Sequence, residues 1–383
     1  MTSVFLPTRR ILLAVGLLAF ALPGPALAAA VSPDDTARFI AGLPPAPDSS
    51  LAVLARKPAW QSHARWFDDA WTKVERERLS KIRDWSAKNL KGRQDTLFYM
   101  FSGPDFVYAN AFFPKASTYL MSGLEPVGRI PVVTEKTLGS LSGLHSSLYT
   151  SLNLSFFITA HMRNDLRERE LGGTLPILLA YLARSGKTVQ DIKLVGLDKD
   201  GNLKPEGELG RAQTADGVKI VFVSAKDAPP QTLYYFRTDV SDSGVANSGF
   251  LKFADGLGSG DGLLKSASYL MHNSNFSKVR EFVLQRANAV VQDDSGIPAV
   301  AFKADDWELN PFGKYVGPIA VFPGAYQARL NELFKKGKPP SLDFGLGYRH
   351  RGYDSNLVLA VKKTAKVEAK ADVKAEAKAE TKQ

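Results

Sequence analysis

The sequence predicts an α/β fold: a mixed sheet flanked by helices, with an N-terminal helical segment and a disordered C-terminal tail. Short apolar runs alternate with helical patterns after Gly92, as in β-α-β units. Residues 190–240 contain β-rich runs joined by short turns, which is typical of an antiparallel meander. Residues 362–383 repeat lysine, alanine and acidic residues and form no apolar face.

The N-terminus has the layout of a cleaved export signal. Arg9 and Arg10 precede an apolar run, 11–22, that is too short to remain in a bilayer, and a small-x-small sequence ends at Ala28. We expect residues 1–28 to be removed and the mature protein to be periplasmic or extracellular, without a membrane span. The paired arginines fit either an ordinary secretory signal or a twin-arginine signal.

Composition narrows the function classes. The chain has no cysteine, which excludes disulfides, a thiolate nucleophile and a cysteine-bound metal. The formal charge of +10 at pH 7 includes the signal and the tail, so the folded part carries an ordinary basic excess. No basic stripe interleaved with aromatic residues points to nucleic acid as a partner.

Residues 29–92 are predicted to be helical. Ser32 has the position of a capping residue, and Pro33 stands at the first helical position. From Pro58 to Leu90 the apolar residues follow a helical stripe that includes several tryptophans. We expect these tryptophans to pack the helix against the body of the protein.

Residues 93–361 are predicted to form the mixed α/β domain. Strands at 96–101 and 117–121 enclose a short helix at 105–113, which predicts a β-α-β unit. A glycine-rich loop is expected at 256–262, before a helix. Further expected elements are helices at 147–170, 174–184, 263–272 and 276–287, and strands at 192–197, 218–223, 232–240, 289–292 and 319–322.

The tail, 362–383, carries a lysine at every fourth position from 366 to 382. In a helix this spacing would place like charges next to each other, so we expect the tail to be disordered. It would serve either as a solubilising segment or as a binding segment for an anionic envelope polymer.

Three turns share one layout and suggest a functional site. Residues 101–105, 121–126 and 293–298 each contain serine, glycine, proline and an acidic residue, and each follows an expected strand. If these strands are parallel neighbours, the turns gather at the carboxyl edge of the sheet, where open α/β folds bind ligands. The same residue types are also the ordinary constituents of turns.

The acidic side chains of these turns could act as general acid and base, or hold sugar hydroxyls or a divalent cation, while the cofactor itself stays unassigned. We expect Asp105 and Asp293 to face each other across one site, each raising the pKa of the other. The candidate catalytic residues are Asp105, Asp293, Asp294 and His272, and the candidate ligand-binding residues are Ser102, Gly103, Glu125 and Ser295.

The other histidines offer weaker signals. His161 with Asp165, and His350 with Asp354, are four residues apart, a spacing that suits two ligands on one helix face. His63 and His145 have no ligand-spaced partner in the sequence.

Several segments resemble those of a family of uncharacterised exported bacterial proteins: Phe101–Phe106, Gly123–Pro126, Ala267–His272 and Gln292–Pro298. The resemblance covers roughly residues 95–350 and implies one continuous unit without assigning an activity. The sequence thus leaves three hypotheses: a hydrolase acting on an envelope or extracellular polymer, a non-catalytic ligand-binding protein of the envelope, and a scaffold whose partner is another protein. Whether the protein is an enzyme, and its oligomeric state, stay open.

Overall fold

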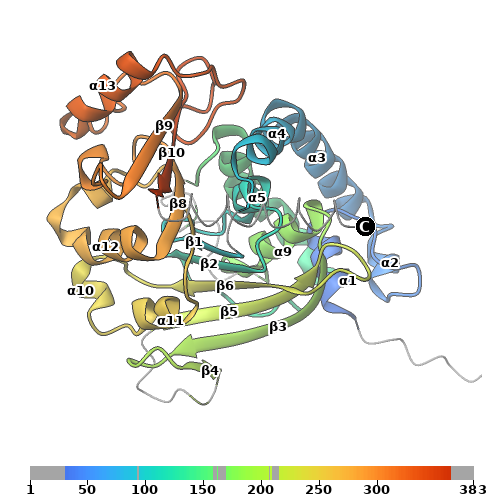
Figure 1. The fold of residues 1–383 in the computed structure, drawn as a ribbon. Coiled ribbons are helices and arrows are strands. Elements are labelled where there is room, and N and C mark those ends of the chain that lie inside the picture. The colour runs from blue at the N-terminus through green and yellow to red at the C-terminus, as the bar shows by residue number, and fades with distance from the viewer. Residues whose placement is uncertain are drawn as a thin grey trace, which may run out of the picture.

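The computed structural model describes residues 31–92, 95–157, 162, 170–206, 208 and 215–363. Ten strands form one sheet in the order β4-β3-β5-β6-β2-β1-β7-β8-β10-β9, and helices cover both of its faces (Figure 1). The predicted α/β class with a mixed sheet is therefore confirmed. The predicted signal and nearly all of the predicted tail lie outside the described residues.

The middle of the sheet is parallel and both flanks are antiparallel. Strands β6, β2, β1, β7 and β8 run parallel to one another. Strand β6 continues into the antiparallel β5, β3 and β4, and β8 into the antiparallel β10 and β9. The strands are β1 (Thr96–Tyr99), β2 (Thr118–Gly123), β3 (Thr188–Leu197), β4 (Leu203–Pro205), β5 (Ala215–Val223), β6 (Gln231–Arg237), β7 (Gly260–Leu264), β8 (Ala287–Gln292), β9 (Trp307–Gly313) and β10 (Asn356–Lys362).

The N-terminal segment is helical, as predicted. It contains α1 (Pro33–Ile40), α2 (Leu51–Leu54), α3 (Pro58–Val74), the π-helical η1 (Glu75–Leu79) and α4 (Ser80–Asn89). The Ser32 side chain caps α1 by accepting a hydrogen bond from the Asp35 amide at 3.0 Å. Trp60 and Trp85 are buried in the main core, which confirms the packing role expected for these tryptophans.

The remaining helices in the described part of the chain lie between the strands. They are α5 (Phe106–Phe112), α6 (Glu135–Ser140), η2 (Leu141–Leu144), α7 (His145–Tyr149), the π-helical η3 (Thr150–Leu154), α9 (Leu175–Arg184), α10 (Asp242–Val245), α11 (Phe250–Gly256), η5 (Leu270–His272), η6 (Ser274–Phe276), α12 (Ser277–Arg286), η7 (Ala299–Ala301), η8 (Pro323–Ala325) and α13 (Ala328–Gly337). No helix in the described part of the chain has the length and apolar character needed to cross a membrane.

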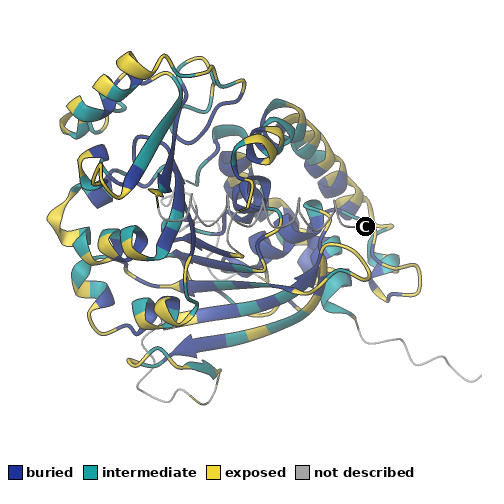
Figure 2. Ribbon diagram, in the orientation of Figure 1, coloured by how far each residue is buried: buried dark blue, intermediate teal, exposed yellow. Residues whose placement is uncertain are grey.

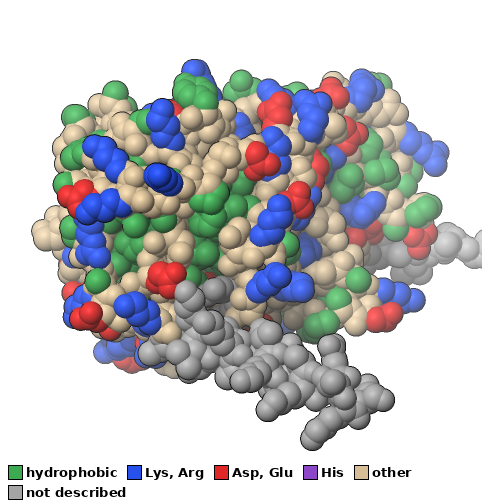
Figure 3. Space-filling model, turned by 45° about the horizontal axis from the view of Figure 1, so that its top comes forward, with side chains coloured by type: hydrophobic (Ala, Val, Ile, Leu, Met, Phe, Trp, Pro, Cys, Tyr) green, Lys and Arg blue, Asp and Glu red, His purple; other side chains and the backbone are tan. Residues whose placement is uncertain are grey.

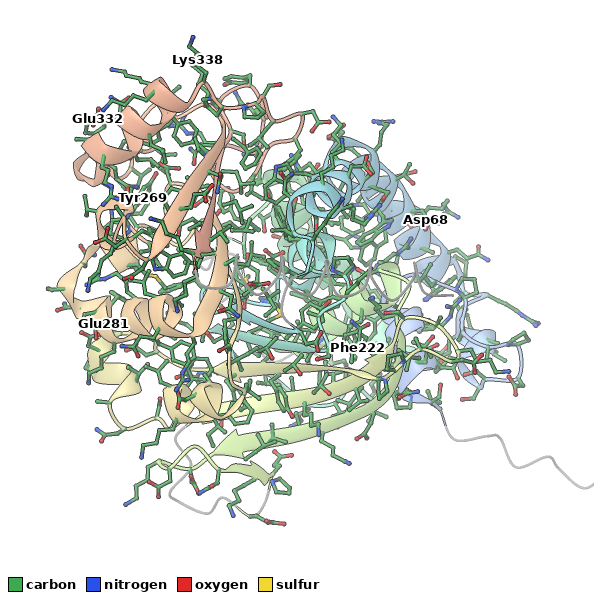
Figure 4. All side chains as sticks on the ribbon, viewed as in Figure 1. Asp68, Phe222, Tyr269, Glu281, Glu332 and Lys338 are labelled. Atoms are coloured by element: carbon green, nitrogen blue, oxygen red, sulfur yellow. The ribbon has the colours of Figure 1, made fainter. Side chains whose placement is uncertain are left out.

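The two faces of the sheet carry separate cores. Alternate residues of β1 point to opposite faces, so Leu97 and Tyr99 join the core that contains α5, whereas Phe98 joins the core that contains α12. On the α5 face, Phe222 of β5 packs edge-on against Phe106, with 5.6 Å between ring centroids (Figure 4). Helices α5 and α12 therefore lie on opposite faces of the sheet.

Burial follows this layering. The central strands and the inward sides of the helices are buried, while the outward sides are exposed (Figure 2). On the face shown in Figure 3, basic and acidic side chains are interspersed, with hydrophobic ones between them.

Two predicted elements around residue 260 are wrong. Residues 263–272 were expected to be one helix and 256–262 a loop, but α11 extends through Gly256 and Gly260–Leu264 form β7. A short apolar run does not distinguish a buried strand from a buried helix. The glycine is required here because a Cβ on Gly260 would lie 2.5 Å from the Thr96 carbonyl oxygen.

Other predicted boundaries also change. Residues 319–322 lie in a turn region and do not form a strand. The helix expected over 147–170 is irregular, because η3 ends at Leu154 and Ser155 adopts a left-handed conformation with φ 66°. Most of the rest of that predicted helix lies outside the described residues.

Candidate functional site

The parallel strands bring the predicted turns to one edge of the sheet. Ser102 and Asp105 follow β1, Glu125 follows β2, and Asp293 follows β8. The first two turns are also linked directly, because the Ser102 and Gly103 amides both donate to the Ser122 carbonyl, at 3.1 and 3.0 Å. The expected gathering at the carboxyl edge is confirmed.

A cavity of about 220 Å³ opens at this edge. Four predicted residues line it: Ser102, Gly103, Asp105 and Glu125. The other four, Asp293, Asp294, Ser295 and His272, are not among the lining residues. The site is thus smaller than predicted and is centred on the ends of β1, β2 and β7.

The cavity lies where the connections of the sheet diverge. From β1 the chain passes through α5 to β2 on one side, and from β7 it passes through α12 to β8 on the other. Because α5 and α12 cover opposite faces, a crevice forms between the carboxyl ends of β1 and β7. Open α/β folds bind ligands in crevices of this kind.

Asp105 and Lys265 form a buried ion pair at the floor of the cavity. Their Oδ2 and Nζ atoms lie 2.7 Å apart, and the side chains are only 1% and 2% exposed. Tyr99 donates its hydroxyl to the same Oδ2 at 2.8 Å, and Lys265 also donates to the Ser155 carbonyl. The Lys265 Nζ lies 4.4 Å from the centroid of the Tyr108 ring. This cluster connects the end of β1 to the end of β7.

The charged neighbour of Asp105 is thus Lys265, and the expected pairing with Asp293 is wrong. Burial raises the pKa of Asp105 above its ordinary value, and the Lys265 ammonium opposes that shift. Sequence reasoning missed Lys265. The available signal was a lysine immediately after the apolar run Leu263–Leu264, because a charged residue ending a buried strand meets whatever lies at the sheet edge.

Glu125 is the second carboxylate of the cavity. The residue is only 7% exposed, and its backbone carbonyl accepts the Tyr235 hydroxyl at 3.1 Å. Its side-chain carboxylate forms no hydrogen bond or ion pair with a residue that the structure describes. A Cβ on Gly123 would lie 2.8 Å from its Oε2 and 3.0 Å from the Cα of Gly103. The two glycines therefore leave the space in which this carboxylate sits.

Asp293 and Ser295 organise the backbone behind the cavity. Asp293 accepts the Ser266 amide through Oδ2, and the Ser295 amide and hydroxyl through Oδ1, at 2.9, 2.9 and 2.5 Å. The Ser295 hydroxyl oxygen accepts the Ala267 amide at 2.8 Å. These bonds tie the turn after β8 to the loop after β7 that carries Lys265.

Asp294 is occupied in a similar way. It accepts the Tyr269 hydroxyl at 2.7 Å and the Asn356 side-chain amide at 3.0 Å, while its own amide donates to Asn356 at 2.8 Å. Tyr269, labelled in Figure 4, belongs to the loop that follows β7. Asp293 and Asp294 both have the contacts of structural turn aspartates.

Replacing Asp293 with asparagine should change the pH dependence of stability. Burial and the adjacent Asp294 carboxylate raise the pKa of Asp293 from 3.8 to about 6. The folded chain then holds a proton that the unfolded chain releases, so this group lowers the free energy of unfolding as pH rises from about 4 to about 6. Asn does not titrate. The stability of the parent relative to Asp293→Asn, measured by urea unfolding, should therefore be lower at pH 7 than at pH 4; a rise would contradict this.

His272 lies beside the Asp294 turn. It ends η5, its ring lies 5.3 Å from that of Tyr269, and its Nε2 is buried without a hydrogen-bond partner in the described part of the chain. Burial lowers its pKa below the ordinary value. Since it does not line the cavity, its contacts fit a structural role near the turn.

The histidine pairs differ from those expected. His63 and His145 do have a partner: His63 Nδ1 lies 2.9 Å from His145 Nε2, and His63 Nε2 lies 2.8 Å from the Ile40 carbonyl oxygen. Asp354, expected beside His350, instead pairs with Arg349 at 2.7 Å.

His161 and Asp165 lie outside the described residues. Among the residues that the structure describes, no three acidic or histidine side chains converge as a metal-binding group. Comparison of the chain with protein-family models, curated proteins and solved structures found no match.

Proposed function

We propose that the chain is an exported protein of the cell envelope or extracellular space that binds a small molecule in the cavity between β1 and β7. The export signal supports the location, and the crevice at the diverging connections supports the site. The observation that carries the proposal is Glu125, whose carboxylate lines the cavity without a side-chain partner among the described residues. A hydrogen-bond donor on a ligand would meet this carboxylate without competing with a side-chain bond inside the described chain.

The walls of the cavity define the rest of the ligand. Six aromatic side chains line it: Tyr99, Phe101, Phe156, Phe157, Phe276 and Tyr348. Aromatic walls favour an apolar body, and they also attract cations. The proposed ligand therefore has an apolar or aromatic body and a hydrogen-bond-donating head, either an ammonium or a hydroxyl, that meets Glu125.

Benzylamine, benzyl alcohol and benzoate test the proposed ligand chemistry, because they share a phenyl ring and differ in their polar group. Calorimetric titration at pH 7 should give the order amine, alcohol, benzoate, because only the first two donate to a carboxylate. Glu125→Gln should weaken benzylamine binding by roughly 10- to 100-fold, the value of a hydrogen bond to a charged group.

Glu281→Gln is the matched control, since Glu281 is exposed on α12 away from the cavity (Figure 4). It should leave all three affinities unchanged. Equal affinity for benzoate and benzylamine, or an unchanged benzylamine affinity in Glu125→Gln, would refute the proposal.

A hydrolase is the second candidate, because the Glu125 carboxylate and the Lys265 ammonium line the same cavity. In this proposal Glu125 takes a proton from water as the water oxygen bonds to the acyl or anomeric carbon of the substrate. The bond from that carbon to the leaving oxygen breaks, and the proton passes from Glu125 to the leaving group. Lys265, held by Asp105, stabilises the negative charge that develops on the substrate oxygen. The substrate would be an envelope or extracellular polymer that offers a short side group to the cavity. Turnover of nitrophenyl esters or glycosides that is lost in Glu125→Gln and kept in Glu281→Gln would favour the enzyme over the binding protein.

A further inference from the structure

A second hollow, of about 490 Å³, lies away from the sheet edge. It is bounded by the α3-η1-α4 helices, by the end of α7 with η3, and by the loop 343–352. Four cations line it: Lys73, Arg78, Lys81 and Arg351. Two carboxylates, Glu77 and Asp343, lie at the same hollow.

None of these four cations forms a salt bridge with a described residue, although ion pairs occur elsewhere on the chain. Lys73 donates to the Asn153 side chain at 3.3 Å, and Lys81 to the Asp343 carbonyl at 2.7 Å. Glu77 pairs instead with Arg76 outside the hollow, at 3.5 Å. Four cations against two carboxylates leave the lining of the hollow with a net positive charge.

Arg78 is the buried member of this set, with 7% exposure. It donates to the Leu152 and Asn153 carbonyls at 2.7 and 2.6 Å, and to the His350 carbonyl at 3.3 Å. These neutral acceptors satisfy its hydrogen bonds and leave its charge without a counter-ion among the described residues. Buried charges in proteins are normally paired, so an anion is the missing component.

The walls are built from unusual backbone. Arg78 belongs to the π-helical segment η1 and Asn153 to the π-helical segment η3, and both segments contribute lining residues to the hollow. π-helical turns occur frequently at functional sites, because they redirect side chains and free backbone groups. Here they bring Arg78 of one segment onto the last carbonyls of the other.

His350 provides a reporter within the hollow. Burial lowers its pKa, and the positive charges of Arg78 and Arg351 lower it further. Its Nδ1 is buried without a hydrogen-bond partner in the described residues. An anion bound beside His350 would offset the effect of both arginine charges on its pKa and favour the protonated ring.

We infer that this hollow binds an oxyanion of the phosphate type. Lys73, Lys81 and Arg351 would contact the anion, and the buried charge of Arg78 would add to the positive potential of the site. The free anion and a phosphate monoester share this chemistry. The inference is independent of the cavity between β1 and β7.

Inorganic phosphate, glycerol phosphate and glycerol are the probes, at constant ionic strength. The full chain should bind the two phosphates and not glycerol, and the ratio of their affinities tells whether the free anion or the ester is preferred. Phosphate should raise the pKa of His350, followed by NMR of the ring protons. Lys73→Met/Arg351→Met should weaken phosphate binding by roughly tenfold or more, since two charge-assisted contacts are lost.

Lys88→Met is the control, because Lys88 is exposed on α4 and does not line the hollow. Arg78 is not substituted, because its hydrogen bonds to the Leu152 and Asn153 carbonyls also hold η3 in place. The inference is overturned if phosphate does not bind, if Lys88→Met weakens binding as much as the double variant, or if the pKa of His350 does not move.

Discussion

Lys265→Met is expected to lower the free energy of unfolding by about 3–5 kcal/mol at pH 7. The substitution leaves the Asp105 carboxylate 1% exposed and without its cation, with neutral donors such as the Tyr99 hydroxyl as its remaining partners. It also frees the Ser155 carbonyl, which accepts from Lys265. Urea unfolding followed by circular dichroism measures the effect.

The double variant Asp105→Asn/Lys265→Met separates the effect of the unpaired charge on stability from the effect of altered side-chain packing. The double variant buries no unpaired charge, so it should be more stable than the two single effects predict when added. Strict additivity of the two substitutions would show that the ion pair does not govern the stability of this edge.

Gly347→Ala should destabilise the fold by roughly 2–5 kcal/mol, from left-handed strain plus overpacking. Gly347 has φ 55°, and a Cβ there would lie 2.2 Å from the Asp293 Oδ2 and 2.8 Å from the Ser266 Oγ. The Asp293 carboxylate cannot swing aside, because three hydrogen bonds hold it.

Gly258→Ala is the matched control. Gly258 has φ 79°, but a Cβ there would meet nothing within 4 Å. It should incur only the left-handed strain, about 1–2 kcal/mol. Equal losses for the two variants, in thermal and urea unfolding, would mean that the space beside Asp293 does not matter.

Local patterns were sufficient for much of the architecture. The cap at Ser32, the helical stripe from Pro58 and the two strands around α5 were all predicted from short stretches of sequence. The edge at which Asp105 and Glu125 meet was also predicted, because parallel strands joined by one crossover must end on the same side.

The sequence did not reveal which long-range partners meet at that edge. Strand β7 inserts between β1 and β8, so Lys265 reaches Asp105 across 160 positions of sequence. The contact of His63 with His145 likewise depends on how α3 packs against later elements. Such contacts follow from the packing of whole layers, which residue spacing does not encode.

The four residues from Leu152 to Ser155 are held by hydrogen bonds from two sides. Arg78 holds the Leu152 and Asn153 carbonyls on the side of the basic hollow, and Lys265 holds the Ser155 carbonyl on the side of the β1–β7 cavity. The Ser155 hydroxyl oxygen also accepts the Gly347 amide at 3.2 Å. Residues 152–155 therefore connect the basic hollow to the cavity between β1 and β7. If a ligand bound at one of these two sites shifts residues 152–155, the ligand affinity of the other site changes. Thermodynamic reciprocity makes this coupling equal in both directions.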